Sequence, residues 1–237
     1  MEDNLFDLNN FELKLQGDSQ GLLGRGNQAS VYLALNNVNC EYYAIKVIDI
    51  DKQRSMFDQI QQIKREIDIH LNLNHPSIIA FYSFHYEENN VFIILEHAEN
   101  GNLENYLRDN FASMPEETKV NIFVKLCEVI QYIHQKGYVY RDLCASNVLL
   151  TAGLEVRLCD FGWSIAQDQP QNDLEWKGDV RYIPPEVFQC KVHAKEVDVW
   201  GLGVILYQLF HNTTPFMEDG QEPDLMSIYS KIKNKEI

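Results

Sequence analysis

Two short polar segments in the second half of the chain could together bind a divalent cation. Asn147 comes directly before the apolar run 148–150, and Asp160 follows a second β-like run thirteen residues later. Asn and Asp side chains at neighbouring strand ends offer the oxygen ligands that Mg²⁺ prefers. Asp142 would then be free to accept a proton. Taken singly, however, each segment is also typical of an ordinary polar loop.

A glycine-rich turn lies between two strand-like runs near the start of the chain. Leu23 precedes Gly24 and Gly26, and these glycines would let backbone N–H groups approach phosphate oxygens closely. Ala29 stands where a full phosphate-binding motif has its third glycine. The segment alone therefore favours a plain hairpin turn over a phosphate site.

Lys46 is the only charged residue in the apolar run 44–48. Its ammonium must either extend to solvent or find a counter-ion, because burying an unpaired charge is costly. Glu66 lies on or beside the apolar stripe of an expected helix and also needs a partner. Pairing Lys46 with Glu66 would satisfy both groups and fix the direction of the lysine.

The elements that must position these residues change in type near residue 100. Before it, β-rich runs at 31–35, 42–48 and 91–95 predict strands. One helix is expected from Met56 to Leu73, where His75-Pro76 would end it. Its apolar face carries Ile60, Ile63, Ile67 and Leu71.

After residue 100 the pattern is helical. Ser113 and Glu116 fit a capping box with Pro115 in the first turn, and Gly137 would end that helix. Further helices are expected over 197–210 and 224–235. The sequence thus predicts a small β-rich lobe, a larger helical lobe and a hinge near 97–101. A cleft between two lobes is a natural ligand site.

Composition excludes several classes of protein. The 237 residues (27.6 kDa) suit one large domain or two small lobes, and 45% hydrophobic content is that of a globular protein. A net charge of −15 argues against binding nucleic acid or an anionic membrane. Five scattered cysteines, no signal-peptide pattern and no apolar run of ~18 residues predict a soluble intracellular protein.

The order of the motifs is more specific than any one of them. The chain resembles a eukaryotic protein kinase domain over residues 11–237, most closely the Aurora and polo-like branches. The resemblance implies an α+β, bilobal protein kinase-like fold: an N-lobe over 11–96, a hinge over 97–101 and a C-lobe over 102–237 that lacks the family's last helices. It rests on the glycine turn, Lys46, Glu66, Tyr140-Arg141-Asp142, Asn147, Asp160-Phe161-Gly162, Pro185-Glu186 and Asp198-Val199-Trp200.

The resemblance also implies roles for single residues. Lys46, held by Glu66, would bind ATP phosphates, Asp142 and Arg141 would serve catalysis, and Asn147 and Asp160 would bind Mg²⁺. His70, Phe81, Tyr140 and Phe161 match a stacked spine of the family. The ATP site would comprise Leu23, Gly24, Gly26, Val31, Ala44, Lys46, Leu95, Glu96, Ala98 and Leu149.

A protein kinase would transfer the γ-phosphoryl of Mg-ATP to a Ser or Thr hydroxyl of a protein. The expected partner is a protein substrate, with neither nucleic acid nor membrane. By resemblance the protein would be cytoplasmic and associate with the cytoskeleton or centrosome, or enter the nucleus.

Some departures from the family pattern bear on activity. Cys144 stands where serine/threonine kinases usually carry a lysine, and nearby carboxylates would raise its pKa, which favours a small filler over a nucleophile. Asp179 replaces the family's threonine and would repel Asp142 unless Arg181 or Lys177 pairs with it. These departures favour a second hypothesis, a pseudokinase-like scaffold that binds nucleotide or a partner with weak or no catalysis.

Two further departures concern the second half of the chain. Residues 165–181 contain no Ser, Thr or Tyr, so phosphorylation there is impossible. We hypothesise that Glu175 pairs with Arg141 in place of a phosphate; a solvated loop acid is the alternative. Family members pair the counterpart of Glu186 with a later arginine, and no arginine follows Arg181. The sequence is then a fragment, or its C-lobe is marginally stable, or a partner covers that lobe.

Overall fold

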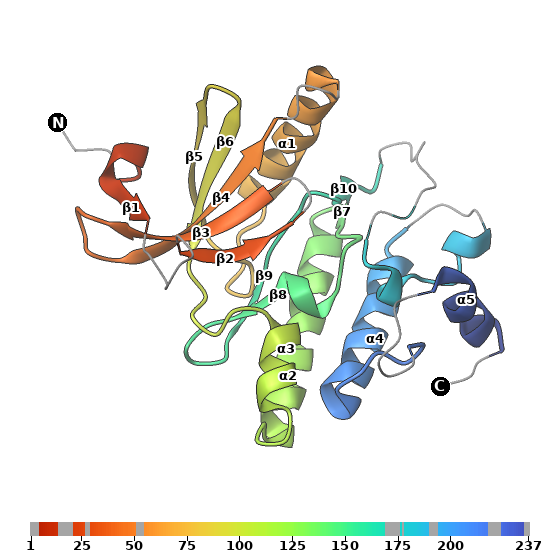
Figure 1. Ribbon diagram of the computed structural model, residues 1–237. Coiled ribbons are helices and arrows are strands. Elements are labelled where there is room, and N and C mark those ends of the chain that lie inside the picture. Colours follow the sequence, from red (N-terminus) through yellow and green to blue (C-terminus); the bar gives the residue numbers. More distant parts are fainter. Residues whose placement is uncertain are drawn as a thin grey trace. The chain divides into compact units, whose positions relative to one another are not determined.

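The computed structural model describes residues 5–13, 21–26, 29–50, 55–168, 176, 178–189, 194–217 and 224–234. The chain divides into two compact units, one of residues 1–74 and 79–99 and one of residues 75–78 and 100–237. The first unit is a β-sheet with one helix and the second is mainly helical (Figure 1). This arrangement confirms the predicted α+β fold class.

The first unit is built on a six-stranded antiparallel sheet (Figure 1). Its strand order is β1-β3-β4-β6-β5, with β2 also paired to β3. The predicted strands are present with slightly wider bounds. The strands are β1 (Phe11–Leu13), β2 (Leu22–Arg25), β3 (Ala29–Asn36), β4 (Tyr42–Asp49), β5 (Phe81–Glu87) and β6 (Asn90–Glu96).

Helix α1 (Met56–Leu71) packs on this sheet through a small apolar core. The Ser55 side chain caps its first turn by accepting a hydrogen bond from the Asp58 N–H. The predicted end at Leu73 is wrong by two residues, because Asn72 ends the helix: its Nδ2 donates to the Asp68 carbonyl at 2.8 Å. The core residues are Ile48, Ile50, Ile67, Val91 and Ile93.

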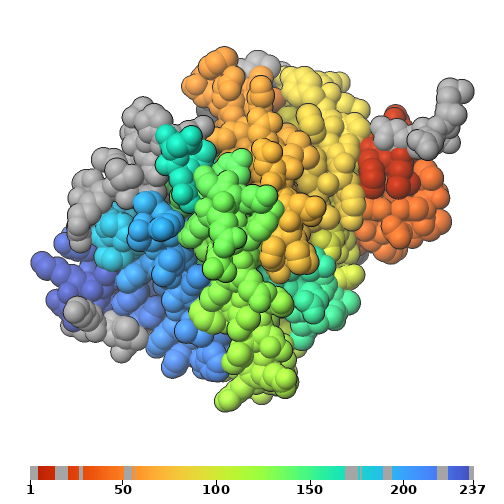
Figure 2. Space-filling model, turned by 180° about the vertical axis from the view of Figure 1, so that it is seen from behind, coloured from red at the N-terminus to blue at the C-terminus, as the bar shows by residue number. Residues whose placement is uncertain are grey.

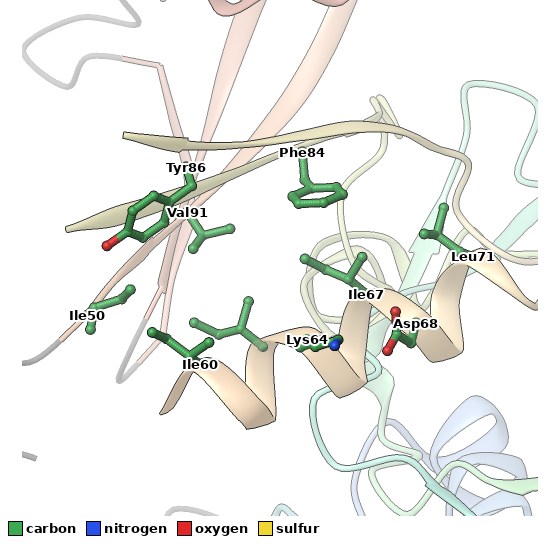
Figure 3. Close-up of a pocket in the computed structure, with 10 residues that line it drawn as sticks. Ile50, Ile60, Lys64, Ile67, Asp68, Leu71, Phe84, Tyr86 and Val91 are labelled. Atoms are coloured by element: carbon green, nitrogen blue, oxygen red, sulfur yellow. The ribbon is translucent and has the colours of Figure 1, made fainter. Parts of the chain in front are cut away.

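A pocket of about 460 Å³ opens between α1 and strands β5 and β6 (Figure 3). The predicted apolar stripe of α1 forms one wall, and Phe84 and Tyr86 of β5 form the opposite wall. Strand β5 is not among the strands expected from the sequence. Its side chains alternate between half-buried and exposed, and the exposed positions hold aromatic residues, so the usual apolar–polar alternation is weak.

The second unit contains four of the helices found among the described residues. They are α2 (Leu103–Asn110), α3 (Glu116–Gln135), α4 (Glu196–His211) and α5 (Leu225–Asn234). In the space-filling view α3 and α4 lie next to each other (Figure 2). Lys235, the expected last residue of α5, lies outside the described residues. As predicted, Gly137 follows the end of α3 with a left-handed φ of 83°.

The predicted capping box at the start of α3 is wrong. Pro115 is the N-cap residue, and no side chain caps the helix there. The Ser113 hydroxyl instead donates to the Asn110 carbonyl at 3.0 Å, which closes the turn after α2. The first backbone hydrogen bond of α3 is accepted by the Pro115 carbonyl, two residues later than a Ser113 cap requires.

Short strands and 3₁₀ turns connect the helices of the second unit. Strands β7 (Tyr138–Val139) and β10 (Ile165–Ala166) pair, as do β8 (Val148–Leu150) and β9 (Val156–Leu158). Residues 75–78 belong to this unit because the Ser77 carbonyl accepts a hydrogen bond from Leu158 N–H. Among the described residues, none of the helices has the length and apolar character to cross a lipid bilayer.

Candidate active site

Lys46 and Glu66 form an ion pair inside the first unit. Lys46 lies on β4, opposite Val31 of β3 and Ile93 of β6, so the strand presents its side chain from the middle of the sheet. Its Nζ lies 2.7 Å from Glu66 Oε1 of α1, and the two side chains are only 13% and 11% exposed. The pairing predicted from the sequence is therefore present. Because it is mostly buried, the pair is screened far less than a surface salt bridge.

The glycine-rich segment forms an exposed hairpin between β2 and β3. The Gly26 N–H donates to the Ala29 carbonyl at 2.8 Å, and the pairing register shifts between Leu22 and Gly24. A side chain built on Gly24 would meet nothing within 4 Å, so the space beside this strand is open. Leu23 is 42% exposed. The geometry is that of a hairpin turn with room for a ligand beside it.

The other residues expected to contact adenine lie at defined positions in the two units. Ala44 on β4 is opposite Leu95 on β6, and both border the core of the sheet. Glu96 is held at the end of β6, where its Oε2 accepts from Ala80 N–H at 3.1 Å. Ala98 is buried shortly after β6. Leu149 lies on β8 in the second unit, opposite Arg157.

The residues of the expected spine stack in pairs within each unit. In the first unit the rings of His70 and Phe81 pack edge to face with their centroids 5.2 Å apart, and His70 Nε2 lies 2.8 Å from the Ile79 carbonyl oxygen. In the second unit Tyr140 and Phe161 meet in the same way at 5.5 Å.

The β8–β9 hairpin brings Asn147 and Asp160 together. Val148 pairs with Leu158, so Asn147 precedes one strand and Asp160 follows the other at the same end of the hairpin. The Cys159 N–H donates to the Asn147 carbonyl at 3.0 Å and closes that end. Asp160 adopts a left-handed φ of 59°, which aspartate tolerates better than most residues, and its Oδ1 accepts from Gly162 N–H at 3.2 Å.

Asp142 is a half-buried carboxylate beside these two residues. Asn147 Nδ2 donates to its Oδ2 at 2.8 Å and to its carbonyl at 2.9 Å. Burial raises the pKa of Asp142 to about 7, and the negative charges of Asp160 and Asp179 add to this increase. The hydrogen bonds from Asn147 and from the Asp179 N–H act in the opposite direction. A carboxyl group with a pKa near neutral is suited to general base catalysis.

The backbone that carries Asp142 is held by a buried acid, Asp198 of α4. Asp198 accepts from the N–H groups of Tyr140 and Arg141 at 2.9 and 2.8 Å, and lies 2.7 Å from His134 Nε2. Arg141 has a left-handed φ of 70°, a strained conformation for arginine. Asp198 compensates this strain. The sequence indicated Asp198 only as part of a motif, and nothing in the sequence indicated its pairing with His134.

The donor set fits a hard cation. Asp160 offers a carboxylate and Asn147 an amide oxygen, since its Nδ2 is directed to Asp142. Within the described part of the chain, no three His, Cys, Asp or Glu side chains cluster as a metal site. A cation here would therefore need further ligands from a bound anion or water, as Mg²⁺ does in nucleotide sites.

Two departures from the family pattern are explained by local contacts. The Asp179 carboxylate faces Arg181, whose Nε lies 2.9 Å from Asp179 Oδ2, so Arg181 supplies the predicted counter-charge. Lys177, the other candidate, lies outside the described residues. The Cys144 thiol is buried, 3.1 Å from Ser146 Oγ, and burial together with the charge of Asp142 raises its pKa well above the usual range. Cys144 is a filler, as predicted.

Two expectations about regulation and stability have different outcomes. Glu175, the proposed partner of Arg141, lies outside the described residues, so that hypothesis stays a prediction. Glu186 is half-buried. None of the described residues forms an ion pair with it, and its partial exposure to water lowers the cost of leaving its charge unpaired.

Comparison with known proteins agrees with the motifs. A family profile described as the protein kinase domain matches residues 18–236, nearly the whole chain. The chain belongs to the protein kinase family.

Within that family the chain is similar to members of both branches expected from its motifs and to one further kinase. It is 32% identical to an Aurora kinase of Candida glabrata over 200 residues, 84% of this chain and 55% of that protein. It is 33% identical to the serine/threonine-protein kinase PLK4 of Aedes aegypti over 208 residues, 87% and 27% of the two chains. The serine/threonine-protein kinase SIK1 of Mus musculus is 34% identical over 91% of this chain and 27% of its own length. The chain thus spans about half or less of the relatives named here.

Proposed function

We propose that this chain is an ATP-dependent protein kinase that transfers the γ-phosphoryl group of Mg-ATP to a Ser or Thr hydroxyl of a protein substrate. The environment of Asp142 carries the proposal. It is a half-buried carboxylate whose desolvation raises its pKa to about 7, and Asn147 fixes its direction. An acid in this state, beside a second acid that suits a cation, has little value for stability and clear value for phosphoryl transfer.

Each residue then has one task in the transfer. Lys46, directed by Glu66, binds phosphate oxygens, and the turn of Gly24 and Gly26, which is open beside Gly24, admits the phosphate chain. Val31, Ala44, Leu95, Glu96, Ala98 and Leu149 contribute to the adenine site. Asp142 accepts the proton of the attacking hydroxyl while its oxygen bonds to the γ-phosphorus and the bond to the β-phosphate oxygen breaks.

Asn147 and Asp160 would hold Mg²⁺, which when bound neutralises charge on the phosphate oxygens. The protein itself contributes mainly positioning and fixed charges. Arg141 supports this arrangement through its backbone, which Asp198 holds in place beside Asp142.

A scaffold that binds nucleotide or a partner, with weak or no catalysis, is the second candidate. Cys144 favours it, because a buried thiol stands where the usual serine/threonine kinases have a lysine for the transferred phosphoryl. Asp179 favours it as well, since it adds negative charge near Asp142.

Phosphate transfer from radiolabelled ATP to a generic basic protein separates the two candidates. We expect incorporation by the wild-type chain and a loss of at least about a hundredfold in Asp160→Ala and Asp142→Asn. Equal counts from all three proteins would contradict the kinase proposal and favour the scaffold. A degenerate peptide library would then define the substrate preference.

A further inference from the structure

Three charged side chains of the second unit form a compact cluster around Arg181. Arg181 Nε lies 2.9 and 3.1 Å from the two Asp179 carboxylate oxygens, and its Nη2 also contacts Asp179. Its Nη1 contacts Glu104 Oε1 of α2. The three side chains are 21 to 29% exposed, so most of the cluster is shielded from water. A guanidinium that engages two carboxylates in this way is fixed in both position and plane.

Residues 178–183, the segment that carries Asp179 and Arg181, lie directly against Asp142. A side chain on Gly178 would be 2.9 Å from Asp142 Oδ1 and 2.8 Å from the Trp176 ring, so only glycine fits. The Asp179 N–H donates to the Asp142 carboxylate. Residues 178 and 179 therefore form part of the immediate surroundings of the Asp142 carboxylate.

The segment is also held through the side chain of Tyr182, and the stretch that precedes Tyr182 offers no hydroxyl group for phosphorylation. The Tyr182 hydroxyl accepts from Ala145 N–H at 3.1 Å and contacts Gln208 Oε1 of α4. Residues 165–181 contain no Ser, Thr or Tyr. Fixed charges must supply any ordering that phosphorylation of this stretch would otherwise give.

We propose that Arg181 is a positioning residue that links Asp179 to Glu104 and so holds residues 178–183 in the conformation that receives the protein substrate, without covalent modification. The substrate-binding part of this inference rests on the proposed kinase function. Without Arg181, the carboxylates of Asp179 and Glu104 would lose their shared cation, and the segment would leave its position against Asp142.

Amide hydrogen exchange tests the linkage without any catalysis. The N–H of Arg181 donates to Asp179 Oδ1, that of Tyr182 to the Asp179 carbonyl and that of Ile183 to the Val180 carbonyl. In Arg181→Met we expect these amides to exchange at least about tenfold faster, a change equivalent to about 1.4 kcal/mol. Glu104→Gln should give a smaller increase, and Arg181→Lys should retain part of the protection. Arg108→Met, which removes an exposed arginine of α2 paired with Asp109, is the matched control and should leave exchange unchanged.

Steady-state kinetics then tests the consequence for the substrate. In Arg181→Met we expect the KM for a peptide substrate to rise about tenfold while the KM for ATP changes less than about twofold. Arg181→Lys should recover part of the loss. A fall of kcat with both KM values unchanged would show a general structural defect and overturn the proposal. Should Arg181→Met fail to fold, Glu104→Gln provides the same two measurements.

The two proposals fail separately. Unchanged amide exchange in Arg181→Met overturns the linkage whatever the activity. Faster exchange in a chain whose wild type transfers no phosphate supports the linkage and overturns the kinase function, and with it the substrate role of Arg181.

Discussion

At the scale of single residues, a buried charge is held by a partner from another element. Lys46 is the only charge in the apolar run of β4 and Glu66 lies on or beside the apolar stripe of α1, so burial requires a partner for each, and the two groups meet at 2.7 Å. The contact between Arg181 and Glu104 could not be predicted in this way. Both residues lie in polar segments, 77 positions apart, and only the folded chain brings them together.

The Lys46–Glu66 pair leads to a first prediction. Lys46→Met should reduce phosphate transfer at least about a hundredfold, because it removes the ammonium that binds phosphate oxygens and leaves Glu66 without its cation. Lys64→Met is the matched control, since Lys64 lies on the same helix α1 with an exposed side chain. A radiolabelled-ATP assay on both variants measures the effect. Comparable losses in the two variants would contradict the role given to Lys46.

Asp142 leads to a prediction about pH. Its pKa is raised from 3.8 to about 7 in the folded protein, so the folded state favours the protonated acid. This contribution to stability is complete below pH 3.8 and is lost as the pH rises through 7, with a loss of at most about 4 kcal/mol. Urea unfolding without Mg²⁺ should therefore show that Asp142→Asn gains stability relative to wild type between pH 5 and pH 8. A constant difference between the two proteins would refute the assignment.

At the scale of elements, helices and central strands were predicted well and their ends less so. The apolar stripe of α1 and the apolar residues of β4 were recognisable in the sequence because both contribute buried side chains to the core of the first unit. Ends depend on single hydrogen bonds. Asn72 ends α1 two residues before the predicted end at Leu73. Ser113 fits the sequence pattern of a cap for α3, but its hydroxyl closes the turn after α2. Strand β5 escaped prediction because its exposed side carries aromatic residues.

The apolar stripe of helix α1 lies partly in the core and partly at the wall of the pocket, and substitutions can test this division. Ile67 is 6% exposed in the core of the first unit, whereas Ile60 is 38% exposed at the wall of the pocket (Figure 3). Ile67→Ala should lower the free energy of unfolding by about 2–5 kcal/mol, since it leaves a cavity. Ile60→Ala should cost clearly less. Urea denaturation of both variants checks this order, and a larger loss in Ile60→Ala would show that the stripe packs differently.

At the scale of the whole molecule, each of the two units holds its own part of the proposed machinery: Lys46 and Glu66 in the first unit, and Asp142, Asn147 and Asp160 in the second. The change of pattern near residue 100 predicted a β-rich part followed by a helical part, but nothing in the sequence indicated that residues 75–78 belong to the second unit. The partners that support the site, such as His134 and Glu104, were not predicted, because a charged residue in a polar surface pattern gives no sign of its contact.

Nucleotide binding should be visible in the stability of the whole chain. At a concentration one hundred times its dissociation constant, Mg-ATP should raise the free energy of unfolding by about 2.7 kcal/mol. Asp160→Ala should lose most of the part that depends on Mg²⁺, since Asp160 offers the carboxylate of the proposed cation site. Thermal melting with ATP in the presence of Mg²⁺ or of EDTA measures both effects. Identical melting curves in all conditions would argue against a nucleotide site.

The cluster of Asp179, Arg181 and Glu104 has a consequence for cellular control. If the proposed kinase function holds, permanent charges set the segment 178–183, and residues 165–181 hold no Ser, Thr or Tyr from which a phosphatase could remove a phosphate. Adding or removing phosphate within this stretch would then not switch the enzyme on or off.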